Sequence, residues 1–180
     1  MPNTLDQKQS TLDEETINEI DSAILSAVDK LMIFRAVEGE TISIDLEGNI
    51  NNILDLLKSI DPFESTRIES IKQKIQNNFK KHLNELPTDG NRFEQEVIYY
   101  LEKLDINEEK VRLNQHCRFF LDTLSSDNHP KGKKLNFISQ EIGREINTLG
   151  AKAYQSDIQR VVVQMKDYLE KIKEQIANAL

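Results

Sequence analysis

The sequence holds one cysteine, Cys117, and no tryptophan among its 180 residues. A single thiol excludes an intramolecular disulfide and a metal cage built from several thiolates. With only 6 Gly and 4 Pro, but 38% hydrophobic residues, the composition excludes collagen-like and disordered chains. No apolar run approaches the roughly 20 residues that cross a bilayer, and residues 1–12 are too polar for a signal peptide. The lack of a disulfide, of a membrane-spanning run and of a signal peptide predicts a cytoplasmic protein with no membrane partner.

Basic residues are in the minority, and they are unevenly spread. Lys and Arg number 23 against 31 Asp and Glu, which gives a formal net charge of −8. Residues 1–60 hold 4 basic and 12 acidic side chains, residues 61–130 hold 10 and 13, and residues 131–180 hold 9 and 6. An acidic balance disfavours nucleic acid as a partner, because phosphate contacts supply most non-specific affinity. The basic last third nevertheless predicts a segment that can bind phosphate.

Alternating strand patterns are almost missing, whereas apolar residues recur at steps of three and four along nearly the whole chain. This spacing places one apolar stripe on each helix. The one alternating stretch, Thr41–Leu46, lies between helical stripes with no turn signal, and we interpret it as helix. The pattern predicts an all-α protein: an extended bundle or helical hairpin array of about five to seven amphipathic helices, whose stripes favour packing between subunits.

Turn chemistry divides these helices. Asp61-Pro62 predicts a helix start, Pro87–Gly90 predicts a break, and Ser125–Gly132 predicts the longest loop. Asn107 and Ser156 stand at predicted N-cap positions.

Carboxylates and arginines share three predicted helix faces. One face carries Glu96 with Arg92, the second carries Glu109 and Arg112 with His116, and the third carries Glu141, Arg144 and Glu145. Carboxylates can hold a divalent cation or accept a proton, arginine can clamp a phosphate, and histidine can transfer protons near neutral pH. The same spacings also occur as ordinary ion pairs on any solvated helix, so this alternative stays open.

Familiar catalytic motifs are missing: we find no glycine-rich phosphate loop, no His-Glu-x-x-His zinc motif and no nucleophile elbow. Cys117 follows His116, but it falls within the apolar stripe of Leu113 and Phe120. This position predicts a buried structural thiol rather than a nucleophile.

Lysines gather before a predicted helix start in the last third. Lys133 and Lys134 follow Pro130, and Lys152 and Arg160 come further along. The free N–H groups of a helix N-terminus also attract anions, so phosphate contact and a merely solvated charge run both remain open. Phe137 and Tyr154 offer rings on which a base can stack, although the position of Phe137 predicts a core side chain.

The C-terminal half resembles the YicC/YloC family of bacterial stress-associated endoribonucleases. The resemblance is carried by Gly132–Ala153, by Asp105–Leu113 with His116, and by the downstream stretch Val161–Ile176. It extends more weakly over residues 12 to 177. Family members have an additional N-terminal α/β portion, and Asn usually stands where this chain has Gly143.

This resemblance implies hydrolysis of single-stranded RNA, assisted by Mn²⁺ or Mg²⁺ with no organic cofactor, in a homo-oligomer that is a hexamer in the family. By matching positions, the implied catalytic residues are His116, Glu109, Arg112, Glu141, Arg144 and Glu145. The implied metal ligands are Glu96, Glu109, Glu141 and Glu145, and the RNA-guiding residues are Lys133, Lys134, Lys152 and Arg160. The alternative is a helical oligomerisation or RNA-binding module that is catalytically incomplete.

The resemblance also predicts the domain organisation. Residues 1–12 form a loose lead-in, residues 13–86 a long-helix region resembling the end of the family's N-terminal domain, and residues 88–180 the C-terminal helical domain.

Overall fold

The computed structural model describes residues 13–82, 90–126 and 130–179. Within these ranges the chain forms six helices and no strand, which confirms the all-α prediction. The helices are α1 (Glu14–Lys58), α2 (Asp61–His82), α3 (Gly90–Lys103), α4 (Asn107–Ser125), α5 (Gly132–Ala153) and α6 (Ser156–Ala179). Thr41–Leu46 lies inside α1, as predicted, and α2 begins at the predicted Asp61. None of the described helices is both long and apolar enough to cross a membrane.

The chain divides into two compact units, Met1–Thr41 and Ile42–Leu180. In the first unit α1 begins after Asp13, whose carboxylate accepts a hydrogen bond of 2.8 Å from the backbone N–H of Thr16. This bond satisfies one of the free donors of the first helical turn, and it lowers the pKa of Asp13. The predicted division between residues 86 and 88 remains a prediction.

Apolar side chains of the first unit stand exposed on α1. They follow the predicted stripe and spread beyond it between Leu31 and Val37: Ile17, Ile20, Ile24, Leu25, Val28, Leu31, Met32, Ile33, Phe34 and Val37. A helix that is apolar around most of its circumference is typical of one covered by partners.

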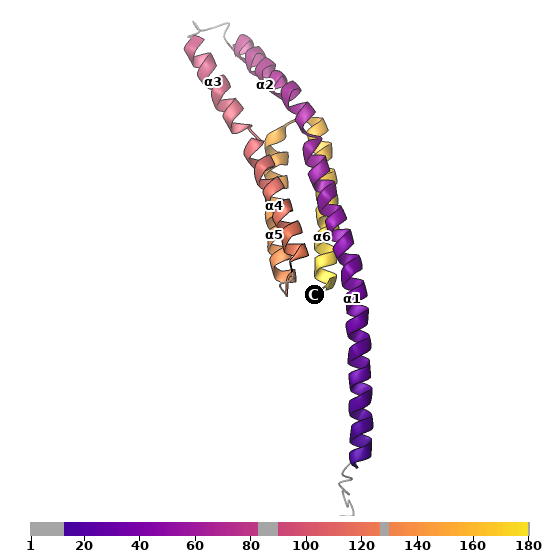
Figure 1. The fold of residues 1–180 in the computed structure, drawn as a ribbon. Coiled ribbons are helices and arrows are strands. Elements are labelled where there is room, and N and C mark those ends of the chain that lie inside the picture. The colour runs from indigo at the N-terminus through magenta and orange to yellow at the C-terminus, as the bar shows by residue number, and fades with distance from the viewer. Residues whose placement is uncertain (1–12, 83–89, 127–129, 180) are drawn as a thin grey trace, which may run out of the picture. The chain divides into compact units, whose positions relative to one another are not determined.

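The core of the second unit lies among α4, α5, α6 and the last part of α1 (Figure 1). Its fully buried side chains include Ile50, Phe120, Ile146 and Met165, and they come from the predicted stripes. The thiol of Cys117 is buried in this core, as predicted, and burial raises its pKa to about 12.

Two glycines let α5 pack closely against α6. A methyl group at Gly143 would lie 3.1 Å from Leu169 Cδ2, and one at Gly150 would lie 3.0 Å from Val162 Cγ1. The two glycines are seven residues apart and therefore share one face of α5. Gly143, which departs from the family pattern, is thus part of this close contact.

Three local predictions were wrong. Phe137, expected in the core, is 58% exposed, because its neighbour Ile138 occupies the buried position of that turn. Ser156 is the first residue of α6 rather than its N-cap, and Asn107 is likewise the first residue of α4. The carboxylate of Asp105 accepts the Asn107 backbone N–H at 3.0 Å, so an acidic residue two positions earlier meets the free donor of that turn.

Candidate functional site

Two contacts fix how α4 and α5 face one another. Lys152 Nζ, near the end of α5, lies 2.8 Å from Glu109 Oε1, near the start of α4. Lys134 Nζ, near the start of α5, lies 4.6 Å from the ring centroid of Phe119, late in α4. The two helices therefore run antiparallel, and these four side chains lie along the same side of the helix pair.

Helical spacing identifies further residues on this side of the helix pair, between the Glu109–Lys152 contact and the Phe119–Lys134 contact. On α4, Glu109, Arg112, His116 and Phe119 follow at steps of three and four residues. On α5, Lys134, Glu141, Glu145 and Lys152 follow at steps of four and seven. Residues at these intervals share one helix face, so the two rows lie along the same side of the α4–α5 pair. We call these eight residues the α4–α5 seam.

The seam gathers most of the predicted site residues. Its middle contains Arg112 and His116 from α4 and Glu141 and Glu145 from α5. The side chains of His116 and both glutamates are half-buried, and Arg112 is exposed. Imidazole, guanidinium and two carboxylates thus reach the same stretch of surface from two facing helices.

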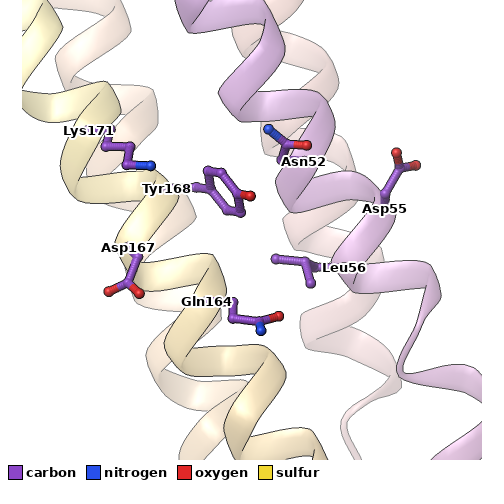
Figure 2. Close-up of a pocket in the computed structure, with 7 residues that line it drawn as sticks. All are labelled: Asn52, Asp55, Leu56, Gln164, Asp167, Tyr168 and Lys171. Atoms are coloured by element: carbon purple, nitrogen blue, oxygen red, sulfur yellow. The ribbon is translucent and has the colours of Figure 1, made fainter.

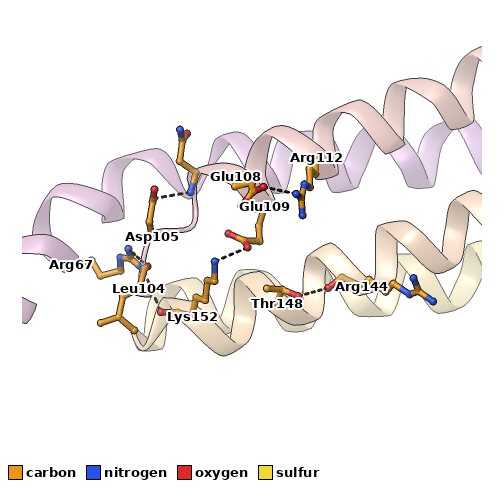
Figure 3. Close-up of polar contacts among 10 residues, drawn as sticks. Arg67, Leu104, Asp105, Glu108, Glu109, Arg112, Arg144, Thr148 and Lys152 are labelled. Carbon is orange, nitrogen blue, oxygen red and sulfur yellow. Dashed lines mark hydrogen bonds and ion pairs between the residues drawn. The ribbon is translucent and has the colours of Figure 1, made fainter. Parts of the chain in front are cut away.

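One end of the seam is closed by a buried ion pair (Figure 3). The Glu109 side chain is only 4% exposed and that of Lys152 is 31% exposed. Within the described part of the chain, Glu109 Oε2 has no hydrogen-bond partner. A buried carboxylate is costly unless it is paired, so Lys152 is needed where it stands.

Arg67 of α2 supports this closed end. Its Nη2 donates to the Leu104 carbonyl at 2.7 Å, and its Nη1 donates to the Lys152 carbonyl at 3.4 Å (Figure 3). Burial lowers the pKa of Arg67, while the charges of Glu64 and Asp105 oppose that shift. Arg67 ties α2 to the segment before α4 and to the end of α5.

Lys110 holds the first turn of α4 against the start of α2. Its Nζ lies 2.6 Å from Asp61 Oδ1 and 2.8 Å from Glu64 Oε2. Burial by itself would lower the pKa of Lys110, but the two carboxylates together outweigh burial, and the pKa lies above its usual value. The helix that carries Arg112 and His116 is thus anchored at its N-terminus.

Some predicted residues lie elsewhere. Arg144 is 73% exposed and pairs with Glu141 at 3.1 Å, and Arg160 of α6 pairs with Asp157 at 3.6 Å. Arg112 pairs with Glu108 on its own helix. These contacts have the spacing of ordinary surface ion pairs. Arg144 thus contacts the seam through Glu141, whereas Arg160 lies on α6 outside the seam, and Lys133 is exposed beside Lys134.

The predicted metal ligands do not form a compact cluster in the described residues. No group of three or more His, Cys, Asp or Glu side chains lies close enough together there to hold a metal ion. The side chain of Glu96 falls outside what the structure describes. Glu141 and Glu145, one turn apart on the same face, are the pair of hard oxygen donors that the seam offers.

Arg67, Lys110 and Phe119 were not singled out by the sequence patterns. The two cations lie on otherwise ordinary charged helices, and their partners are 37 to 85 residues away in sequence. Phe119 directly precedes a core residue, Phe120, and its exposure follows only from the packing of α4. An apolar ring just off the buried stripe was the available signal for Phe119.

A second concavity lies between α1 and α6 (Figure 2). This cleft of about 470 Å³ is lined by Asn52, Asp55, Leu56, Gln164, Asp167, Tyr168 and Lys171. Two of its charged side chains have partners, since Asp55 pairs with Lys58 at 2.9 Å and Lys171 lies over the Tyr168 ring. The cleft contains none of the predicted site residues.

The fold and the seam define an all-helical protein in which charged and polar side chains line one side of two antiparallel helices. The family model "Endoribonuclease YicC-like, C-terminal" matches residues 60–179, and the chain belongs to this family. It is 31% identical over 98% of its length to a protein of Clostridioides difficile strain 630 named "Probable endoribonuclease YicC". It is 28% identical over 92% of its length to the protein of the same name in Haemophilus influenzae. The chain spans 61% and 58% of the lengths of these two relatives.

Proposed function

We propose that this chain is the helical part of a metal-assisted endoribonuclease that hydrolyses phosphodiester bonds of single-stranded RNA. Two findings support the proposal: the chain belongs to the YicC-like family, and one histidine, one arginine and two glutamates lie on the same side of the α4–α5 pair. The seam is the observation that carries it, because RNA hydrolysis needs proton transfer and neutralisation of phosphate charge at one place.

The side chains suggest a division of labour. Arg112 is exposed at the rim of the groove and can take a phosphate in exchange for its surface partner Glu108. His116 is half-buried at mid-groove, where it can give or accept a proton. Glu141 and Glu145 would hold Mn²⁺ or Mg²⁺, which supplies charge for the phosphate when bound.

The closed end has a supporting role in this proposal. Glu109 is buried against Lys152, so it positions that lysine at the end of the groove rather than meeting RNA directly. Lys133 and Lys134 guide the strand at the other end. Arg144, which is paired with the seam residue Glu141, and Arg160 of α6 are both largely exposed and take at most outlying phosphates.

The proposal is tested by incubating the purified chain with a labelled single-stranded RNA, with Mn²⁺ or Mg²⁺ and with a chelator. We expect internal cleavage that the chelator abolishes. His116→Ala and the double change Glu141→Gln with Glu145→Gln should each reduce cleavage at least about 100-fold. Glu170→Gln, in an exposed ion pair on α6, serves as the matched control and should leave the rate unchanged. Cleavage that is unaffected by both seam variants would refute the assignment of the site.

A second function is favoured by the exposed apolar residues of α1: a helical self-association and RNA-binding module without catalysis. Homo-oligomerisation, with a hexamer as the family's form, would cover these side chains. Binding of RNA without metal-dependent cleavage would favour this function over the first.

A further inference from the structure

Phe119 and Phe137 are large rings that stand exposed at one end of the seam. Phe119 on α4 is 46% exposed and Phe137 on α5 is 58% exposed. Both lie just outside the buried stripes of their helices, next to the core residues Phe120 and Ile138. Both rings therefore present apolar surface to solvent at this end of the seam.

Lys134 lies over the Phe119 ring, and Phe137 follows on the same helix. Lys134 lies 4.6 Å from the centroid of Phe119, and Phe137 follows Lys134 by three residues, which places it one turn along the same side of α5. Lys133 is exposed beside them. The end of the seam opposite the Glu109–Lys152 pair thus combines two apolar rings with two ammonium groups.

This combination matches the two parts of an unpaired nucleotide. Nucleobases stack on aromatic rings whatever their sequence, and ammonium groups attract the phosphates that join them. We propose that Phe119 and Phe137 form a stacking platform for unpaired RNA bases, with Lys134 placed to take the neighbouring phosphate. This inference rests on the proposed function, since the platform leads into the groove that holds Arg112 and His116.

The position of the platform gives it a role in substrate choice. A paired base is stacked between its neighbours and cannot lie flat on a side chain, so the platform selects single-stranded RNA over duplex. A strand anchored there continues along the row of Arg112 and His116 toward Lys152. The rings would therefore set which phosphate reaches the middle of the groove.

Another ring provides a control. Tyr99 on α3 is 57% exposed, and Lys103 lies 5.9 Å from its centroid. This pair has the same arrangement as Phe119 and Lys134, an exposed ring beside a lysine, but it belongs to a helix outside the seam. A general effect of exposed aromatic residues on RNA retention would appear equally at Tyr99 and at Phe119.

The test is fluorescence anisotropy of labelled oligonucleotides in chelator, so that no strand is cleaved. The probes are a single-stranded RNA, its duplex, and an abasic strand of equal length that keeps the phosphates but has no bases. Phe119→Leu, which retains apolar volume without an aromatic face, should weaken single-strand binding at least about 5-fold. It should leave the abasic strand unaffected, and Phe119→Trp should restore binding. Lys134→Met should weaken both strands, and Tyr99→Leu neither.

The outcomes separate this inference from the function on which it rests. If the unchanged chain does not bind single-stranded RNA, both proposals fail. If it binds but Phe119→Leu and Phe137→Leu bind equally well, only the platform is refuted. Light scattering measures whether Phe119→Leu changes the oligomeric mass of the protein. A changed mass with unchanged RNA affinity would mean that the Phe119 ring contacts another protein subunit, and it would also refute the platform.

Discussion

The Glu109–Lys152 pair offers the sharpest test of the geometry at the closed end of the seam. Replacing Lys152 by Met keeps the length of the side chain and removes its charge, which leaves a carboxylate that is 4% exposed without a partner. Breaking a buried ion pair in this way costs about 3–5 kcal/mol. Lys152 itself is 31% exposed, so solvent screens part of the attraction. We therefore expect a loss of about 2–3 kcal/mol at pH 7.

Urea unfolding measures this loss. With a urea dependence of about 1–3 kcal/mol per molar for a small protein, the midpoint should fall by about 1–2 M.

Two control variants test whether the loss of stability in Lys152→Met comes from the buried carboxylate of Glu109. Lys173→Met removes a pair of the same length, 2.8 Å, between exposed side chains of α6, and should cost less than about 1 kcal/mol. The double change Glu109→Leu with Lys152→Met removes both charges and should recover most of the stability. A loss below about 1 kcal/mol in Lys152→Met would refute the buried pair.

Three further outcomes follow from the structure. The Cys117 thiol has a pKa of about 12 in the folded chain, and a thiol in the unfolded chain titrates near 8.5, so the free energy of unfolding falls as the pH rises between these values. The difference in the free energy of unfolding between the unchanged chain and Cys117→Ala, measured by urea unfolding, should shrink by about 1–2 kcal/mol from pH 8 to pH 10. A difference that stays constant would contradict the burial of the thiol. Tyr154 ends α5 with a φ of 43°, in the left-handed region that favours glycine, so Tyr154→Gly should raise the melting temperature by roughly 2–4 °C rather than lower it. Leu31→Glu places a charge on a side chain that is exposed on α1. Under the proposed self-association, it should reduce the molecular mass measured by light scattering while altering the free energy of unfolding by less than about 0.5 kcal/mol. An unchanged mass would exclude that face of α1 from self-association.

Much of the fold could be predicted because helices are local structures. The i, i+3 and i+4 spacing of apolar residues depends only on neighbours along the chain, and it identified the stripes that carry Ile50, Ile146 and Met165 into the core. The same local reasoning placed Thr41–Leu46 inside α1 and Cys117 in the interior. It failed at Phe137, where a ring adjacent to the stripe was assigned to the core.

The sequence predicted which side chains could form the candidate site, but not how they are arranged in space. Sequence patterns selected Arg112 with His116, and Glu141 with Glu145, as two separate helix faces with no relation between them. Their meeting along one seam depends on the rotation and direction of α4 against α5, which the contacts of Lys152 and Lys134 establish. Such contacts join residues far apart in sequence, so no local spacing encodes them.

The sequence by itself therefore determined the helices, their buried stripes and the residue types available for chemistry, because each is set within a few turns of one helix. Only the tertiary structure decided which faces meet, that Glu109 is buried against Lys152 while Arg144 remains in solvent, and that Phe119 stands beside Lys134. The physical reason is that burial and pairing depend on what the neighbouring helices leave uncovered. That property belongs to the assembled second unit and to no helix in isolation.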